Sequence, residues 1–187
     1  MPAYTPTQIP SGETICAKVA ALPTLLVDTR EKKPLSFKHL QAEKETLLSG
    51  DYSVRGLADV FAVERKTMAD LLRSLSSERK RFMHELHRLR GFANARLLVI
   101  GTQTELYVLL RSRGVSLNMV EHSLLSIEQR FQLPVHRVNT ADEAACLVES
   151  WAFVAWRNAA AKLGIELPYP HWVQGTLAPG KSTNDPL

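Results

Sequence analysis

Cysteine is scarce in this 187-residue chain, and no long apolar run occurs in it. Its two cysteines, Cys16 and Cys146, lie far apart and outside any Cys-x-x-Cys pattern, so a reducing, cytoplasmic setting is the simpler expectation. No stretch approaches the roughly 18 apolar residues of a membrane span, which excludes membrane insertion. The N-terminus lacks a basic region followed by an apolar one, and no secretory signal is expected.

The sequence also lacks the motifs of several common enzyme classes. It has no Gly-x-x-x-x-Gly-Lys-Ser/Thr loop and no Gly-x-Gly-x-x-Gly after a strand, so nothing supports a nucleotide-binding fold. His84 and His87 are three residues apart, whereas a zincin helix needs His-Glu-x-x-His. We therefore interpret both histidines as part of a solvated helix face.

The composition is that of an ordinary globular protein. Hydrophobic residues make up 45% and charged residues 22% of a chain whose length suits one domain. Residues 1–22 are rich in proline, threonine and serine and suggest an N-terminal arm. Prolines with interspersed glycines mark residues 165–187 as a tail without a helix or strand pattern. The folded domain is therefore expected at residues 23–164.

Hydrophobic periodicity alternates between strands and helices along the expected domain. Strands are predicted at 24–27, 52–54, 60–65, 96–100 and 134–138. Helices are predicted at 67–75, 78–90, 104–111, 117–131 and 140–164, and the polar stretch 32–44 is predicted to be loop with some helix. This alternation predicts an α/β fold with a central sheet flanked by helices, in which a hairpin over 52–65 supplies an antiparallel part.

Two carboxylates and a lysine near the hairpin form the main candidate site. Asp51 precedes the first hairpin strand, and Glu64 and Lys66 end the second. Residues two apart in a strand share a face, so Glu64 and Lys66 should project together while Arg65 points to the opposite side. Mg²⁺ prefers one or two carboxylates plus water and substrate oxygens, and a neighbouring ammonium suits phosphodiester hydrolysis. The simpler alternatives are a turn residue at Asp51 and an ordinary Glu64–Lys66 pair on a solvated strand.

Further charged residues flank this set. Asp28, Arg30 and Glu31 follow the first buried strand, from which they would reach the same edge of the sheet. Taken alone they would suit a surface ion-pair turn, and only the neighbouring motifs favour a place in the site. Asp70 lies three residues after Thr67, so either the site or a capping box at a helix N-terminus explains it, and the two roles are compatible.

Positive charge is concentrated between residues 64 and 96. That stretch has nine Lys or Arg against four acids, in a chain with a net charge of +4. A charge run is usually a solvated helix face. Because the excess follows the carboxylates directly, we interpret it as a surface that contacts the phosphate backbone of DNA. The residues expected to bind DNA are Arg73, Arg79, Lys80, Arg81 and Arg88.

Three motifs in this order resemble the XPF-type family of structure-specific endonucleases, within the restriction-endonuclease-like superfamily. They are Val27–Glu31, Gly50–Tyr52 and Glu64–Asp70, and the resemblance is strong over residues 24–105. It implies a restriction-endonuclease-like fold with a central mixed β-sheet, and a metal-dependent DNA endonuclease that cuts branched, flapped or otherwise structured DNA. The lack of helix-hairpin-helix modules suggests a short, single-domain form of prokaryotic or phage type, acting on DNA inside the cell.

The resemblance also implies roles for single residues. Asp51 and Glu64 would be direct ligands of Mg²⁺ or Mn²⁺, with Asp28 as a further acidic contact, and Lys66 would be the catalytic lysine. The other positions that the family associates with the catalytic site are Arg30, Glu31, Arg65 and Asp70. One position departs from the family, because Gly101 stands where many relatives carry a glutamate after the strand.

Two other functions stay open from the sequence. The resembling family pairs active nuclease domains with degenerate ones, so a non-catalytic DNA-binding or scaffolding subunit is the main alternative. Degenerate partners typically lose the carboxylates, whereas every signature position is filled here, which favours an enzyme. The third function is an assembly module, and the family resemblance also implies a possible homodimer.

Overall fold

A computed structural model describes residues 22–174 and contains one six-stranded sheet. Its strands lie in the order β2-β1-β3-β4-β5-β6. They are β1 (Leu25–Asp28), β2 (Ala42–Glu45), β3 (Tyr52–Val54), β4 (Phe61–Thr67), β5 (Asn94–Ile100) and β6 (Val135–Val138). β3 runs antiparallel to β1 and β4 whereas the other neighbours are parallel, so the sheet is mixed and the predicted hairpin is confirmed.

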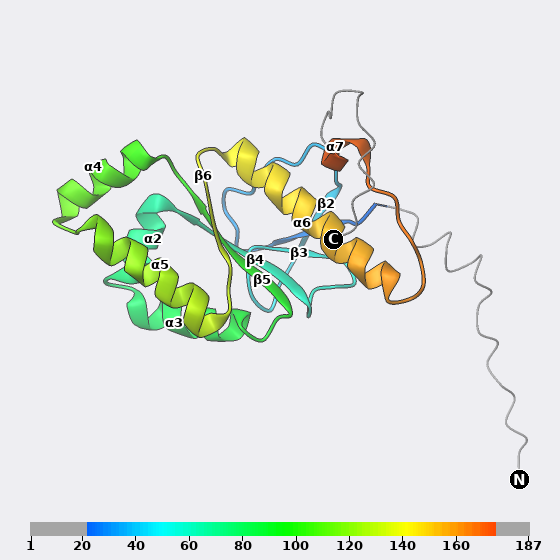
Figure 1. Cartoon of the computed structure of the whole chain (residues 1–187), viewed down its shortest axis with the longest axis horizontal. Coiled ribbons are helices and arrows are strands. Elements are labelled where there is room, and N and C mark those ends of the chain that lie inside the picture. Colours follow the sequence, from blue (N-terminus) through cyan, green and yellow to red (C-terminus); the bar gives the residue numbers. More distant parts are fainter. Residues whose placement is uncertain (1–21, 175–187) are drawn as a thin grey trace, which may run out of the picture.

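Helices cover both faces of this sheet. They are α2 (Met68–Leu75), α3 (Arg79–Leu89), α4 (Gln103–Arg113), α5 (Leu117–Phe131), α6 (Ala141–Ala161) and α7 (His171–Gln174). Figure 1 shows α2 to α5 gathered on one side, whereas α6 runs across the other. The predicted α/β fold is confirmed. Within residues 22–174, no helix is both long enough and apolar enough to cross a membrane.

Side-chain caps define where four of these helices begin. The hydroxyl oxygens of Thr67, Thr102, Ser116 and Thr140 each accept a hydrogen bond from the backbone N–H three residues later. Such a cap satisfies a donor that the first helical turn leaves without a partner. At Thr67 the strand β4 passes directly into α2. The polar residues at the end of β4 therefore lie at the edge of the sheet.

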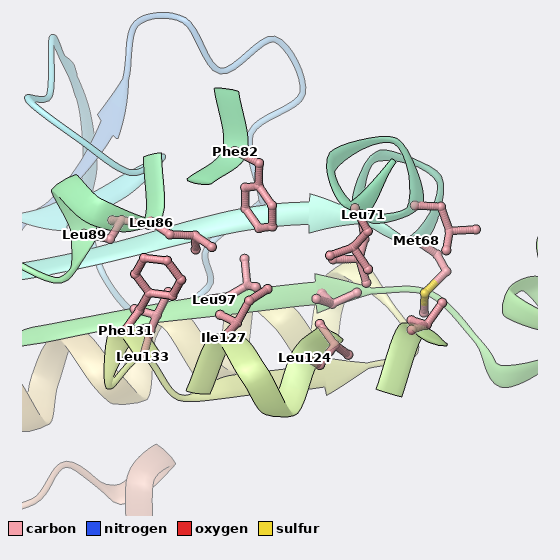
Figure 2. Close-up of a cluster of buried hydrophobic side chains, with 14 of the residues drawn as sticks. Met68, Leu71, Phe82, Leu86, Leu89, Leu97, Leu124, Ile127, Phe131 and Leu133 are labelled. Atoms are coloured by element: carbon pink, nitrogen blue, oxygen red, sulfur yellow. The ribbon is translucent and has the colours of Figure 1, made fainter. Parts of the chain in front are cut away.

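The larger hydrophobic core lies between the sheet and helices α2, α3 and α5. Figure 2 shows part of it, with Phe82, Leu86 and Leu89 of α3 packed near Leu97 of β5. These four side chains are at most 1% exposed. Burial of each side chain contributes about 1.5–3 kcal/mol. The three apolar side chains of α3 are therefore enough to hold this helix on the sheet. The polar side chains next to this apolar side, on Arg81, Glu85 and Arg88, are free to serve the site.

The opposite face of the sheet packs against α6. Ala144, Ala145 and Ala152 are buried there, and such small side chains let the helix lie close to the strands. Glu149 of α6 is 1% exposed, and its Oε1 accepts hydrogen bonds from the backbone N–H groups of His39 and Leu40 at 2.6 and 2.9 Å. This buried carboxylate holds the connection between β1 and β2 in place.

Two local predictions are wrong. The stretch 32–44 contains no helix and leads into β2, whose four residues are all exposed and therefore show no apolar alternation. β2 exists because it pairs in parallel with β1, a contact between distant residues. The tail expected to lack helix contains α7, and Ile165 and Leu167 are buried against Trp156. Residues 1–21 and 175–187, most of the expected arm and tail, lie outside the described residues.

Candidate active site

β4 carries the central pair of the site. Lys66 Nζ donates a hydrogen bond to Glu64 Oε1 at 2.9 Å, on the face that α3 covers. Arg65, between them, pairs instead with Glu31 at 2.9 Å. Strand alternation thus separates the residues of Glu-Arg-Lys, as predicted. The pair does not lie on a solvated strand, because the side chains of Lys66 and Glu64 are only 9% and 7% exposed.

Asp51 reaches the same place from the loop between β2 and β3. Its Oδ2 accepts a hydrogen bond from the backbone N–H of Arg65 at 2.7 Å, and its own N–H donates to the carbonyl oxygen of Val63 at 2.8 Å. Gly50 permits this approach, because its φ is +81° and a Cβ there would lie 3.1 Å from the same carbonyl oxygen. The Gly-Asp sequence therefore places a carboxylate directly beside β4.

The fold disfavours the ionised forms of both Asp51 and Glu64. Burial raises the pKa of Asp51 to about 6, and the charge of Glu31 adds to the effect. Burial also raises the pKa of Glu64 to about 8, with a further contribution from the charge of Asp51, although the Lys66 ammonium opposes both shifts. Two such carboxylates in one cleft are stabilised in their ionised form when a cation binds between them.

The oxygens of these two carboxylates fit a Mg²⁺-type cation. Among residues 22–174, Oδ1 of Asp51 and Oε2 of Glu64 accept no hydrogen bond, so each residue keeps a hard oxygen donor available. Nowhere in this part of the chain do three His, Cys, Asp or Glu side chains form a ready-made metal cage. Mg²⁺ needs no such cage, because it is usually held by one or two carboxylates, waters and substrate phosphates.

Asp28 orders the neighbouring loop. Its Oδ1 accepts from the backbone N–H and Nε of Arg30, both at 2.7 Å, and its Oδ2 accepts from Nη2 of Arg30 at 2.8 Å and from the backbone N–H of Leu47 at 2.9 Å. The hydrogen bonds from Arg30 lower the pKa of Asp28 to about 2. Four donors use the whole acceptor capacity of an ionised carboxylate. Asp28 thus ties the ends of β1 and β2 together.

Asp70 lies in the first turn of α2, where Thr67 is the predicted N-cap residue. Thr67 Oγ1 donates to Asp70 Oδ2 at 2.7 Å and accepts from the backbone N–H of Asp70 at 3.2 Å, and Arg73 pairs with the same carboxylate. Burial opposes ionisation of Asp70, but the hydrogen bonds from Thr67 and Arg73 outweigh it and lower the pKa. Asp70 also borders the cleft described next, so the capping role does not remove it from the site.

The structure brings every residue predicted to be catalytic to one cleft of about 660 Å³. These residues are Asp28, Arg30, Glu31, Asp51, Glu64, Arg65, Lys66 and Asp70. Of the residues expected to bind DNA, Arg81 and Arg88 line the cleft from α3. Arg73 is paired with Asp70, Arg79 borders a hollow between α3 and α5, and Lys80 lies outside the cleft. Arg81 is itself paired with Glu78, so Arg81 and Arg88 differ from the other three residues only in bordering the cleft.

One charged residue that contacts the central pair is not among the site residues predicted from the sequence. Glu85 of α3 places its Oε2 3.2 Å from Lys66 Nζ. The available signal was helical spacing, because Arg81, Glu85 and Arg88 fall on one side of α3 at intervals of four and three residues. The charge count treated Glu85 only as a partial offset to the basic residues.

The residues that form this site also fall within the model of a known protein family. A model of the ERCC4 domain matches residues 27–150, from the first motif into α6. The chain belongs to the ERCC4 domain family. Together with the fold, this confirms the predicted resemblance to an XPF-type endonuclease domain. The matched range contains every residue of the predicted catalytic set.

Solved structures similar to this ERCC4 domain include XPF from Aeropyrum pernix, free and in complex with DNA. The free structure is 22% identical, with a TM-score of 0.59 over 79% of this chain and 66% of that chain. The DNA complex is 22% identical, with a TM-score of 0.57 over 71% of this chain and 64% of that chain. The chain thus spans slightly less than two thirds of these structures, and the likeness shows a shared fold. No curated protein sequence matches this chain.

Proposed function

We propose that this ERCC4 domain is a Mg²⁺- or Mn²⁺-dependent DNA endonuclease that hydrolyses phosphodiester bonds in branched, flapped or otherwise structured DNA. The observation that carries the proposal is the placement of Asp51, Glu64 and Lys66 in one cleft bordered by Arg81 and Arg88. A similar fold in a complex with DNA supports DNA as the ligand. The proposal places the protein inside the cell, in association with DNA.

In this mechanism Asp51 and Glu64 would hold the cation. When bound, it would supply polarisation of the phosphodiester and a lowered pKa of water. Lys66 donates to Glu64 and Glu85, which leaves one of its three donors for the phosphate, where the ammonium would stabilise the negative charge that develops. Arg81 and Arg88 bind neighbouring phosphates and set the position of the scissile one.

The remaining predicted catalytic residues have supporting roles in the proposal. Asp28 and Arg30 hold the loops that carry Glu31 and Asp51, because the hydrogen bonds of Asp28 leave no oxygen of that carboxylate unused. Arg65 and Glu31 form a pair on the other side of β4, and the backbone N–H of Arg65 orients Asp51. We therefore assign direct cation binding to Asp51 and Glu64. The role that we assign to Asp28 is to order the loops beside them.

A cleavage panel tests the proposal directly. Purified chain is incubated with single-stranded, duplex, flap, fork and four-way DNA, with Mg²⁺ or Mn²⁺ and with EDTA. We expect cleavage of at least one branched substrate with either metal ion and none with EDTA. No cleavage of any substrate at high protein excess would instead support the alternative, a non-catalytic DNA-binding or scaffolding subunit.

Arg81 and Arg88 give a prediction for DNA binding. Replacing both with glutamine should lower affinity about tenfold near physiological salt and reduce the slope of log K against log salt by about two, because each arginine neutralises one phosphate. Fluorescence anisotropy with a labelled fork, measured over a series of salt concentrations, gives both quantities.

The matched control uses two exposed arginines of α4, outside the cleft. Changing Arg111 and Arg113 to glutamine alters the net charge equally, and the salt slope should stay near that of the unchanged chain. An equal loss in both double variants would show that binding follows net charge and not the cleft. Light scattering of the same samples, with and without DNA, tests the implied homodimer.

A further inference from the structure

We propose that Glu85 is a positioning residue, which holds the Lys66 ammonium at the reacting phosphate while Glu64 is engaged with the cation. This proposal rests on the nuclease function proposed above. Glu85 lies outside the three motifs that carry the family resemblance, and it comes from α3, whereas Glu64 shares β4 with the lysine.

Three groups surround the ammonium of Lys66. Nζ lies 2.9 Å from Glu64 Oε1, 3.2 Å from Glu85 Oε2 and 4.8 Å from the centre of the Phe82 ring. Phe82 and Glu85 are three residues apart on α3 and hence on the same side of it. The long, flexible lysine side chain is thus held in one place by two elements of the fold.

Glu64 alone is a poor anchor for this lysine. Once a cation shares the negative charge of Glu64, the attraction between Glu64 and Lys66 weakens. Glu85 stays available, because its only ionic partner among residues 22–174 is Lys66. It therefore keeps the ammonium in the cleft at the stage when the lysine has to meet the phosphate.

The position of Glu85 is otherwise unfavourable. It stands between Arg81 and Arg88 on the cleft side of α3, where a negative charge repels the phosphate backbone. The fold does not need it, because Phe82, Leu86 and Leu89 anchor α3 through nearly complete burial. A charge that opposes DNA binding and is not required for packing indicates a role at Lys66.

The test compares Glu85→Ala and Glu85→Gln with Glu121→Ala. Glu121 of α5 pairs with Arg137 of β6, so its loss removes a similar helix-to-strand ion pair outside the cleft. Glu85→Ala should lower the single-turnover cleavage rate at saturating DNA about tenfold or more, because small misplacement of a reacting group is costly. Its DNA affinity should be unchanged or higher. Glu85→Gln should recover most of the rate, because its amide oxygen still accepts from Lys66.

A second readout does not depend on cleavage. Amine-reactive labelling of the metal-free chain, followed by peptide mass spectrometry, should modify Lys66 several-fold faster in Glu85→Ala than in the unchanged chain or Glu121→Ala. Unchanged labelling and unchanged cleavage in Glu85→Ala would overturn the proposal, as would an equal rate loss in Glu121→Ala. If the unchanged chain cuts no DNA, the nuclease proposal fails, and labelling still decides whether Glu85 restrains Lys66.

Discussion

Changing Glu64 to glutamine should lower cleavage at least about 100-fold while DNA binding persists. The amide preserves size but removes the charge that a divalent cation needs, and the transition state loses its main electrostatic support. Single-turnover cleavage of a fork and anisotropy of the same labelled fork measure the two effects. Retained cleavage would show that Glu64 is not a cation ligand.

The same variant gives a stability readout. Burial raises the pKa of Glu64 from 4.5 to about 8 in the fold, so near pH 7 the metal-free native state must take up a proton that the unfolded chain has lost, which destabilises the native state. Glu64→Gln should therefore melt at the same or a higher temperature without metal. Added Mn²⁺ should raise the melting temperature of the unchanged chain and leave that of Glu64→Gln unchanged. Glu43→Gln, which alters an exposed carboxylate of β2 paired with Arg55, should behave like the unchanged chain in every assay.

Changing Asp28 to asparagine should destabilise the fold by about 2 kcal/mol at pH 7. This figure follows from the pKa of Asp28, which its hydrogen bonds with Arg30 lower from 3.8 to about 2. The effect should shrink at high salt, because the Arg30 side chain is 67% exposed. Urea unfolding of both chains at several pH values measures the difference.

The stability difference between the unchanged chain and Asp28→Asn should depend on pH. A carboxylate with a lowered native pKa stabilises the fold above its unfolded pKa, and the contribution disappears as the pH falls through the native value. The two chains should therefore differ fully above pH 4 and converge toward pH 2. Asp59→Asn is the control, because Asp59 is an exposed carboxylate in the turn between β3 and β4. A difference between the unchanged chain and Asp28→Asn that stays constant from pH 7 to pH 2 would contradict the ionic origin.

The elements with strong internal patterns were predictable from the sequence. α5 matches its predicted range, and α2, α3 and β5 differ by one or two residues at their ends, because apolar periodicity and capping residues are local signals. The same alternation correctly separated Arg65 from Glu64 and Lys66. β2 was not predictable, because all four of its residues are exposed and its strand form depends on β1.

The sequence by itself determined the family, the α/β class and the candidate acidic and basic residues, because short motifs and strand periodicity are encoded by neighbouring residues. Only the tertiary structure decided their contacts. It placed Asp51 against β4, saturated Asp28 with four hydrogen bonds, set Arg81 and Arg88 at the border of the cleft and brought Glu85 to Lys66. These contacts join residues distant in the chain, and the packing of the sheet and α3 determines which of them meet.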